Sequence, residues 1–326
     1  MSRLFNENQM DQWHTKFSLW MLLLSSPIVH NEIVIIDTDA GADDAIAVYL
    51  ALKSKLAQNV KALTAVTGNA QVDDVVVNLI KTLGTAGFEV PIYKGMRTPW
   101  SGHIYSDGYF GNDGFGDFDY DGPLNKSLIQ KVHAVDFMID LVKKHPKQVT
   151  IICIAPLTNI AEAGKRFSDF YNLVNKLIIL GGNSSPESSI EFNMKADTKA
   201  ANFVFDHLND NCSAVVIPYE LFTGKNTFPL EYRKNVLGKI DNKIVQLFNN
   251  AERISFTKTN EWRTPDELAA AYWFQPDIVT SSTIGKPFVD PDTGRMIILE
   301  GKTANIILSV DMKKMKNIIF NSFERF

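Results

Sequence analysis

Four aspartates lie within eight residues near the start of the chain, in the segment Asp37-Thr-Asp-Ala-Gly-Ala-Asp-Asp44. Asp37 and Asp39 directly follow an apolar run, and residues two apart on a strand point the same way. Carboxylates packed so closely repel one another unless some are protonated or a cation lies among them. Oxygen ligands of this kind suit a hard cation such as Ca²⁺ or Mg²⁺. The segment therefore predicts a divalent metal site.

Two of the four aspartates have an ordinary alternative explanation. Asp43 and Asp44 would open a helix, where the helix dipole favours acidic residues in any protein. This explanation does not cover Asp37 and Asp39, which follow the apolar run. Gly41 between the two pairs permits a sharp turn, so we expect a strand, a turn and a helix that present carboxylates at one edge.

The elements that must position these aspartates follow from the alternation of apolar runs and helical patterns after residue 32. Continuous β-branched runs alternating with helices are typical of a mostly parallel sheet with helices on both faces. In such open sheets, ligands bind beyond the carboxyl ends of the strands, where the aspartates lie. Strands are expected at 32–37, 60–66, 90–93, 149–154, 176–180 and 214–218, and helices at 45–53, 72–83 and from about 157.

Two regions depart from this alternation. Residues 102–123 are rich in Gly, Asp, Tyr and Phe without any period, which is typical of a functional loop, and the aromatic residues argue against disorder. Residues 290–294 separate two extended runs and predict a hairpin. No repeat or low-complexity linker divides the chain, so we expect one α/β domain at 32–326, preceded by an N-terminal extension or signal segment at 1–31.

The composition excludes some classes of partner. The chain has 326 residues, 45% of them apolar, and a net charge of −4 without a basic cluster, so neither nucleic acid nor a membrane is expected as a partner. The apolar block Phe17–Leu24 is too short to span a bilayer. It fits a signal-peptide core or an apolar extension, which leaves secretion open while favouring the cytoplasm. Cys153 and Cys212 cannot make a disulfide framework, and Cys153 is expected in the core.

The pattern D-T-D-x-G-x-D-D-A after an apolar strand resembles the signature of the inosine-uridine-preferring nucleoside hydrolase family. Later segments resemble the same family in the same order, and together they extend the resemblance from about residue 32 to at least 275. These segments are Thr67-Gly-Asn69, Ile154-Ala-Pro-Leu-Thr-Asn159, Glu191-Phe-Asn193 and Thr264-Pro-Asp-Glu-Leu-Ala269. The resemblance implies an open, Rossmann-related sheet and Ca²⁺-dependent hydrolysis of ribonucleosides to ribose and free base, in a homodimer or homotetramer.

The resemblance also assigns a metal site and a general base. Carried over by position, Asp39 is a metal ligand and the base that takes a proton from water. Asp44 and Asp266 are the other carboxylate ligands, and the backbone carbonyl of Ile154 completes the set. Asp266 has an ordinary alternative as a helix-start residue after Pro265.

Ribose-binding residues are implied in the same way. Asp43, Asn69 and Asn193 would hold the 2′- and 3′-hydroxyls, and Glu191 the 5′-hydroxyl. Asn183 follows the double glycine Gly181-Gly182. The family usually has a further asparagine in the next segment, and in our interpretation Asn183 replaces its contact with the substrate. Asn69 as a turn residue and Glu191 as a surface charge are the alternatives.

The leaving base presents a departure from the family. Many members carry His immediately before the late aspartate, but this chain has Pro265 there. Purine-preferring members instead stack the base between aromatic side chains, so a purine preference is expected here. Trp262, four residues before Asp266, is the first candidate for this stacking, and His103 is a candidate proton donor. The further aromatic candidates are Trp100, Tyr105, Tyr109, Phe110 and Tyr272.

Two other functions compete with this one. A lone D-x-D-x-G suggests a Mg²⁺-dependent phosphatase with Asp37 as nucleophile, but the Lys and the second acidic pair that it needs cannot be placed. A nucleoside-binding protein without catalysis would explain the missing His. Retention of Asp39, Asp43, Asp44 and Asp266 argues against such a loss.

Overall fold

The computed structural model describes residues 32–183, 190–209 and 211–324. The predictions for 1–31, including the apolar block, lie outside the described residues. The part of the chain from Ile33 onward forms one unit. None of the helices in the described ranges is both long enough and apolar enough to cross a bilayer.

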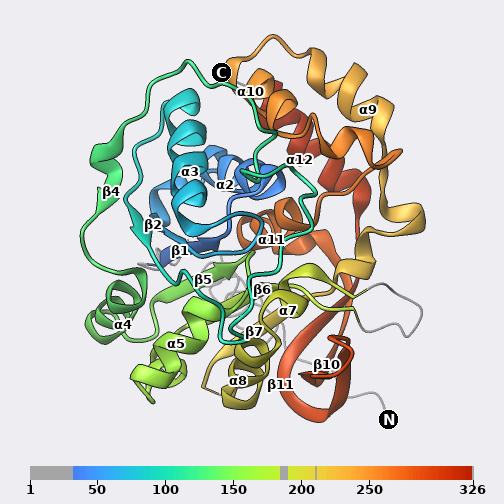
Figure 1. Ribbon diagram of the computed structural model, residues 1–326. Coiled ribbons are helices and arrows are strands. Elements are labelled where there is room, and N and C mark those ends of the chain that lie inside the picture. The colour runs from blue at the N-terminus through green and yellow to red at the C-terminus, as the bar shows by residue number, and fades with distance from the viewer. Residues whose placement is uncertain (1–31, 184–189, 210, 325–326) are drawn as a thin grey trace, which may run out of the picture. The chain divides into compact units, whose positions relative to one another are not determined.

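A nine-stranded sheet forms the centre of this unit, in the order β10-β11-β7-β6-β5-β1-β2-β3-β4 (Figure 1). All neighbours pair in parallel except the hairpin β10–β11, so the predicted fold class is confirmed. The strands are β1 (Ile33–Thr38), β2 (Val60–Ala65), β3 (Ile92–Lys94), β4 (Ile129–Gln130), β5 (Val149–Cys153), β6 (Lys176–Leu180), β7 (Ser213–Ile217), β10 (Val279–Val289) and β11 (Met296–Val310), with a separate pair β8 (Phe228–Pro229) and β9 (Glu261–Trp262).

Helices cover both faces of the sheet (Figure 1). One face carries α2 (Ala42–Lys53), α3 (Val72–Ala86), α10 (Lys243–Ala251), α11 (Pro265–Phe274) and α12 (Met312–Glu324), and the other carries α4 (Ala134–Lys144), α5 (Thr158–Arg166), α6 (Phe170–Leu173) and α8 (Thr198–His207); α7 (Phe192–Ala196) and α9 (Leu230–Asn235) are short.

The side chains of β1 explain why two cores form. Val34 and Ile36 belong to the core with α2, whereas Ile35 belongs to the core with α4 and α5. Successive residues of a strand point to opposite faces, so a strand covered on both faces reads as a continuous apolar run. Cys153 on β5 is fully buried in the second core, as expected.

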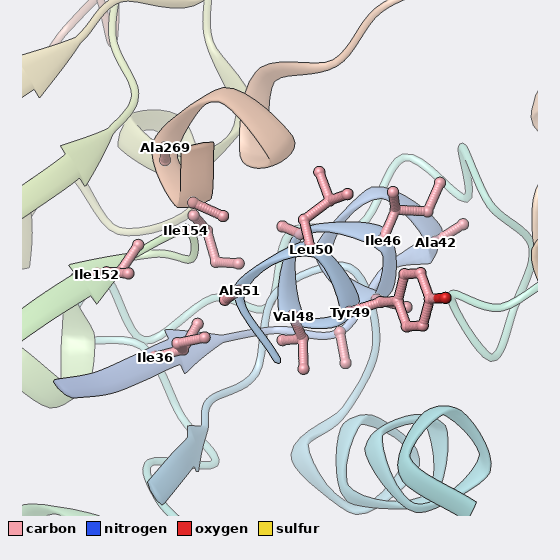
Figure 2. Packing of buried hydrophobic residues seen from close by; sticks show 14 of the residues in the cluster. Ile36, Ala42, Ile46, Val48, Tyr49, Leu50, Ala51, Ile152, Ile154 and Ala269 are labelled. Atoms are coloured by element: carbon pink, nitrogen blue, oxygen red, sulfur yellow. The ribbon is translucent and has the colours of Figure 1, made fainter. Parts of the chain in front are cut away.

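Helix α2 lies inside the first core rather than on its surface. Figure 2 shows its apolar side chains pointing in several directions, toward Ile36 and Ile152 of the sheet and toward Ala269 of α11. A helix that is apolar all round is typically a buried one. The beginning of α2 is therefore held firmly relative to β1 and α11.

The order of the strands creates a switch point beside β1. From β1 the chain runs outward through β2, β3 and β4, then returns to place β5 on the other side of β1. Ligands of open α/β sheets bind outside the carboxyl ends of the strands at such a point. The acidic segment after β1 and Ile154 after β5 both lie there.

Predicted and observed elements differ mainly at their boundaries. Helix α2 begins at Ala42 rather than at 45, and α3 extends to Ala86 rather than 83. The predicted hairpin near 290–294 joins β10 to β11. Residues 102–123 contain no helix or strand, as the lack of periodicity predicted.

Candidate active site

Two helices begin beside the end of β1 and bring acidic residues together. Helix α2 carries Asp43 and Asp44 in its first turn, and α11 starts with Pro265 followed by Asp266 and Glu267. The two helices pack against each other. Each helix N-terminus carries partial positive charge, which stabilises the carboxylates that gather there.

Asp44 is held by a set of hydrogen bonds from the strand end and the turn. Thr38 Oγ1 donates to its Oδ1 at 2.6 Å, and the Gly41 N–H donates to its Oδ2 at 2.9 Å. The Asn69 side-chain amide also donates to Oδ2, at 3.3 Å. Burial raises the pKa of Asp44 to about 6, although these hydrogen bonds lower it. The carboxylate is therefore fixed in direction before any ligand arrives.

Asp39 is fully buried and has one carboxylate oxygen without a partner among the described residues. Its Oδ2 accepts from the Asn69 backbone N–H at 2.6 Å, while Oδ1 has no hydrogen bond. Burial and then repulsion from Asp44 raise the pKa of Asp39 well above its usual range. Gly68 permits this geometry, because a Cβ there would lie 1.9 Å from Asp39 Oδ2.

Three carboxylates are placed so that one ion could touch them all. Ligand oxygens of Asp43, Asp44 and Asp266 all lie within 4.8 Å of one another. Burial, with repulsion from Asp43 and Asp44, raises the pKa of Asp266 well above its usual range. Repulsion of this kind and the unpartnered oxygen of Asp39 are what a bound divalent cation would relieve. The residues present therefore fit a hard metal ion.

Asp37 is not one of these three carboxylates, and hydrogen bonds from other residues hold one of its oxygens. Asp37 Oδ1 accepts from Thr64 Oγ1 at 2.6 Å and from Asn159 Nδ2 at 2.8 Å. Asn159 Oδ1 also accepts from the Met96 N–H at 2.8 Å. Asn159 is fully buried and connects β1 to the segment after β3.

A cavity of about 280 Å³ opens beside the acidic group. It mixes carboxylates, amides and aromatic rings, and one cation, Arg263, is found among its described lining residues. The lining consists of Asp43, Asn69, Asp107, Tyr109, Phe110, Ile154, Leu180, Ile190, Glu191, Phe192, Asn193, Tyr219, Arg263, Pro265 and Asp266.

Most of the residues singled out from the sequence gather at this cavity. Asp43, Asn69, Ile154, Glu191, Asn193 and Asp266 line it. Asp39 and Asp44 lie behind Asn69, to which both are hydrogen-bonded. Asn183 is buried but is not part of the lining.

Glu191 has a structural role that the sequence did not suggest. It is 5% exposed, so its alternative interpretation as a surface charge is wrong. Its carboxylate accepts from the N–H groups of Gly182, Asn193 and Met194 at 2.8–2.9 Å. It thus caps α7 and joins that helix to the glycine turn after β6, while still lining the cavity.

The aromatic candidates separate into two groups. Tyr109 and Phe110 line the cavity. Trp262 instead is buried, donates from Nε1 to Glu252 at 2.6 Å, and lines an adjoining space of only about 30 Å³. The other candidates, Trp100, Tyr105 and Tyr272, and the exposed His103 are not part of the cavity lining.

Four residues at or beside the site were not singled out from the sequence. Tyr219 follows β7, and the rule that ligands bind beyond strand ends could have found it. Arg263 lies three residues before Asp266, directly before the segment that resembles the family. Asp107 comes from the aperiodic loop, and Glu267 is a fully buried carboxylate whose oxygens have no hydrogen bond in the described part of the chain. Asp107 lies in the loop predicted to be functional and Glu267 in the segment 264–269 that resembles the family, but neither signal singles out the individual residue.

Solved structures with the same arrangement define the class of fold. An inosine-guanosine nucleoside hydrolase superposes with a TM-score of 0.82 over 90% of this chain and 99% of that chain, at 24% identity. A purine-preferring ribonucleoside hydrolase from Gardnerella vaginalis gives 0.78 over 90% and 98%, also at 24% identity. The chain therefore has the nucleoside hydrolase fold.

Sequence comparison is more specific. Uridine nucleosidase 1 of Arabidopsis thaliana is 36% identical over 184 residues, which is 54% of this chain and 53% of that protein. The pyrimidine-specific ribonucleoside hydrolase RihB of Escherichia coli strain SE11 is 32% identical over 181 residues, 53% of this chain and 55% of that protein. The chain thus spans about half the length of the curated relatives it matches. The family model for inosine-uridine preferring nucleoside hydrolases matches residues 34–317, so the chain belongs to this family.

Proposed function

We propose that the protein hydrolyses the N-glycosidic bond of ribonucleosides, giving ribose and free base, with the help of Ca²⁺. One observation carries the proposal. Ligand oxygens of Asp43, Asp44 and Asp266 lie within 4.8 Å of one another beside the cavity, and these aspartates come from two elements more than 200 residues apart in sequence. Family membership supports the same chemistry.

The metal would be held by oxygen atoms from four places in the chain, namely the turn after β1, the start of α2, the end of β5 and the start of α11. Asp39, Asp44, Asp266 and the backbone carbonyl of Ile154 are the proposed ligands, and Asp43 is close enough to contribute as well. Such an all-oxygen set suits Ca²⁺. When bound, the ion would supply positive charge that makes a nearby water more acidic.

Asp39 is the proposed general base. Its carboxylate is oriented by the Asn69 N–H on one oxygen, which leaves the other free to accept a proton. In the reaction, the bond between C1′ and the base nitrogen breaks and its electron pair leaves with the base. Water forms the new bond to C1′, and one of its protons passes to Asp39. The departing base takes up a proton from solvent, and Asp39 then releases its proton to solvent, so the enzyme ends unchanged. The products are ribose and the neutral base.

Ribose binding is assigned to side chains along the cavity wall. Asn69, Asn193 and Asp43 are proposed to hold the 2′- and 3′-hydroxyls, and Glu191 the 5′-hydroxyl. Glu191 already accepts three backbone N–H groups, but a carboxylate has about four lone-pair directions, so one further donor can be accommodated. Asn183 does not line the cavity, so it would act on ribose binding through the residues that do.

The preferred base depends on the aromatic side of the cavity. Tyr109 and Phe110 offer faces on which a purine or a pyrimidine ring can stack. Stacking was the basis for expecting a purine preference, and these two side chains now carry that proposal in place of Trp262. The similar proteins named above include a purine-preferring and a pyrimidine-specific enzyme.

A phosphatase is disfavoured by the charge of the cavity. The described lining of the cavity contains one cation, Arg263, and four carboxylates. These carboxylates belong to Asp43, Asp107, Glu191 and Asp266. A doubly charged phosphate would be repelled there unless cations outnumbered these groups.

A panel assay tests the proposed function. Ribose release would be measured from inosine, guanosine, adenosine, uridine and cytidine, after treatment with a chelator and again after addition of Ca²⁺. We expect release from at least one nucleoside, loss with the chelator and recovery with Ca²⁺. No release from any nucleoside, together with phosphate release from a phosphoester, would favour the phosphatase.

A further inference from the structure

A tyrosine and an arginine lie together on the cavity wall. The arginine is close in sequence to the position at which many family members carry His. Arg263 is two residues before Pro265, the position that carries His in many family members. Its Nη1 donates to Tyr219 Oη at 3.3 Å, and its Nη2 donates to Glu261 at 3.2 Å. Both Tyr219 and Arg263 line the cavity.

One hydrogen-bond donor of Arg263 has no partner among the described residues. Its Nε is buried and has no hydrogen-bond partner among the described residues. Its side chain is 38% exposed and its ion pair with Glu261 is similarly open. An exposed pair of this kind contributes little to the free energy of folding. Stabilisation of the fold therefore does not explain the position of Arg263 on the cavity wall.

Arg263 and the acidic residue Asp266 line the same cavity. Arg263 lies three positions before Asp266, so their Cα atoms are at most about 11 Å apart. Tyr109, Tyr219 and Arg263 all line this cavity, and the guanidinium carbon of Arg263 lies 6.0 Å from the centroid of the Tyr219 ring. A ribose held near Asp266 would direct its base toward them.

We infer that Arg263, oriented by Tyr219 and Glu261, contacts the leaving nucleobase and stabilises the negative charge that develops on it. This inference rests on the proposed hydrolysis. A guanidinium has only donors, and it pairs well with adjacent acceptors such as O6 and N7 of a 6-oxopurine. A uracil carbonyl is the corresponding acceptor on a pyrimidine. Donors aimed at developing charge are a large part of many rate enhancements.

The Tyr219 hydroxyl supports this role in two ways. It accepts from Arg263 and therefore keeps its own O–H for another acceptor. Burial raises the pKa of Tyr219, so the group keeps its proton at neutral pH. Together the two side chains provide neighbouring donors without any histidine.

The test compares leaving groups of different quality. Rates of the parent, Arg263→Met, Arg263→Lys and Tyr219→Phe would be measured with the best nucleoside of the panel and with 4-nitrophenyl β-D-ribofuranoside. The nitrophenolate is a stable anion and needs no donor. Arg97→Met is the matched control, because Arg97 pairs with Asp73 on the surface and does not line the cavity.

Arg263→Met is expected to lower kcat for the nucleoside by on the order of 10²-fold and to leave the nitrophenyl substrate within about threefold. Arg263→Lys, which keeps the charge, should fall between, and Tyr219→Phe should show the same pattern with a smaller loss. Equal losses on both substrates, or no loss on either, would overturn the inference while the proposed function stands. A parent that cleaves no nucleoside overturns the proposed function, and this inference with it.

Discussion

The two sides of the cavity are built differently. The acidic side comes from the end of β1 and the first turns of α2 and α11, and hydrogen bonds fix the carboxylates of Asp39 and Asp44. The base side comes from the 102–123 loop and from Tyr219 and Arg263, which are partly exposed. Bond-breaking chemistry requires fixed geometry, whereas binding of different bases tolerates looser walls.

This difference predicts what each side controls. Changes on the acidic side should act on turnover, on metal binding and on the stability of the fold, because the same hydrogen bonds serve all three. Changes on the base side should act on the leaving group and on base selection with little effect on stability.

The largest expected effect is that of Asp39→Asn. The variant keeps the size of the side chain but cannot accept the proton from water, so kcat for ribose release should fall by about 10²- to 10⁴-fold. Burial and repulsion from Asp44 already disfavour the charge on Asp39. The melting temperature of the metal-free variant should therefore equal or exceed that of the parent.

Two measurements decide this prediction. Steady-state rates give kcat, and thermal unfolding followed by circular dichroism gives stability. Turnover at the parent rate would show that Asp39 is not the base. A large loss of stability would instead show that the variant fails through its fold.

The second prediction concerns Asn159→Leu. The substitution removes the donor to the fully buried Asp37 and the acceptor of the part-buried Met96 N–H. Unsatisfied buried groups cost about 1–3 kcal/mol each, so the free energy of unfolding should fall by on the order of 3 kcal/mol. Urea denaturation with an unchanged slope would measure it.

Asp107→Ala is the matched control from the base side. The Asp107 carboxylate also orders nearby backbone, since it accepts the Tyr109 N–H at 2.8 Å, but it is exposed. We expect a change within about 0.5 kcal/mol, as for most surface substitutions. If this variant loses as much stability as Asn159→Leu, the contrast between the two sides is wrong.

The sequence predicted the acidic side of the cavity better than the base side. The acidic residues stand in a short pattern after a strand, and general rules of parallel sheets place that pattern at the ligand-binding edge. Asp266 was reached through the family resemblance, and the structure brings it to Asp43 and Asp44. The order of the outer strands, including the hairpin beside β7, had no local signal.

The base side was less predictable because it depends on contacts between distant segments. Trp262 and Tyr109 are both aromatic residues near sequence motifs, yet only Tyr109 lines the larger cavity. Trp262 is drawn away by its hydrogen bond to Glu252, which itself pairs with buried Arg233. No periodicity or spacing reports a tertiary partner of this kind.

Binding of Ca²⁺ to the folded protein should raise stability on the acidic side. An ion at 100 times its Kd stabilises the native state by about 2.7 kcal/mol, which for a chain of this size is a melting shift of several degrees. Thermal unfolding with chelator and with Ca²⁺ measures the shift without any assay of activity. Asp266→Asn should reduce the shift, whereas Arg263→Met should keep it. Equal shifts in Asp266→Asn and the parent would place the ion elsewhere.

The smallest expected effect lies in the turn between Asp39 and Gly41. Ala40 is fully buried and has a φ of 34°, in the left-handed region that costs a residue with a Cβ about 1 kcal/mol or more. Ala40→Gly relieves this cost but loses a buried methyl group and adds freedom to the unfolded chain. These contributions nearly cancel, so the free energy of unfolding should change by less than about 1 kcal/mol.

Ala51→Gly, in the ordinary helical backbone of α2 and equally buried, has no strain to relieve and should cost about 1–2 kcal/mol. Urea midpoints of the two variants, compared with the parent, measure the difference. If both substitutions cost the same, the backbone at Ala40 stores no strain, and the rigidity of the acidic side comes from its hydrogen bonds alone.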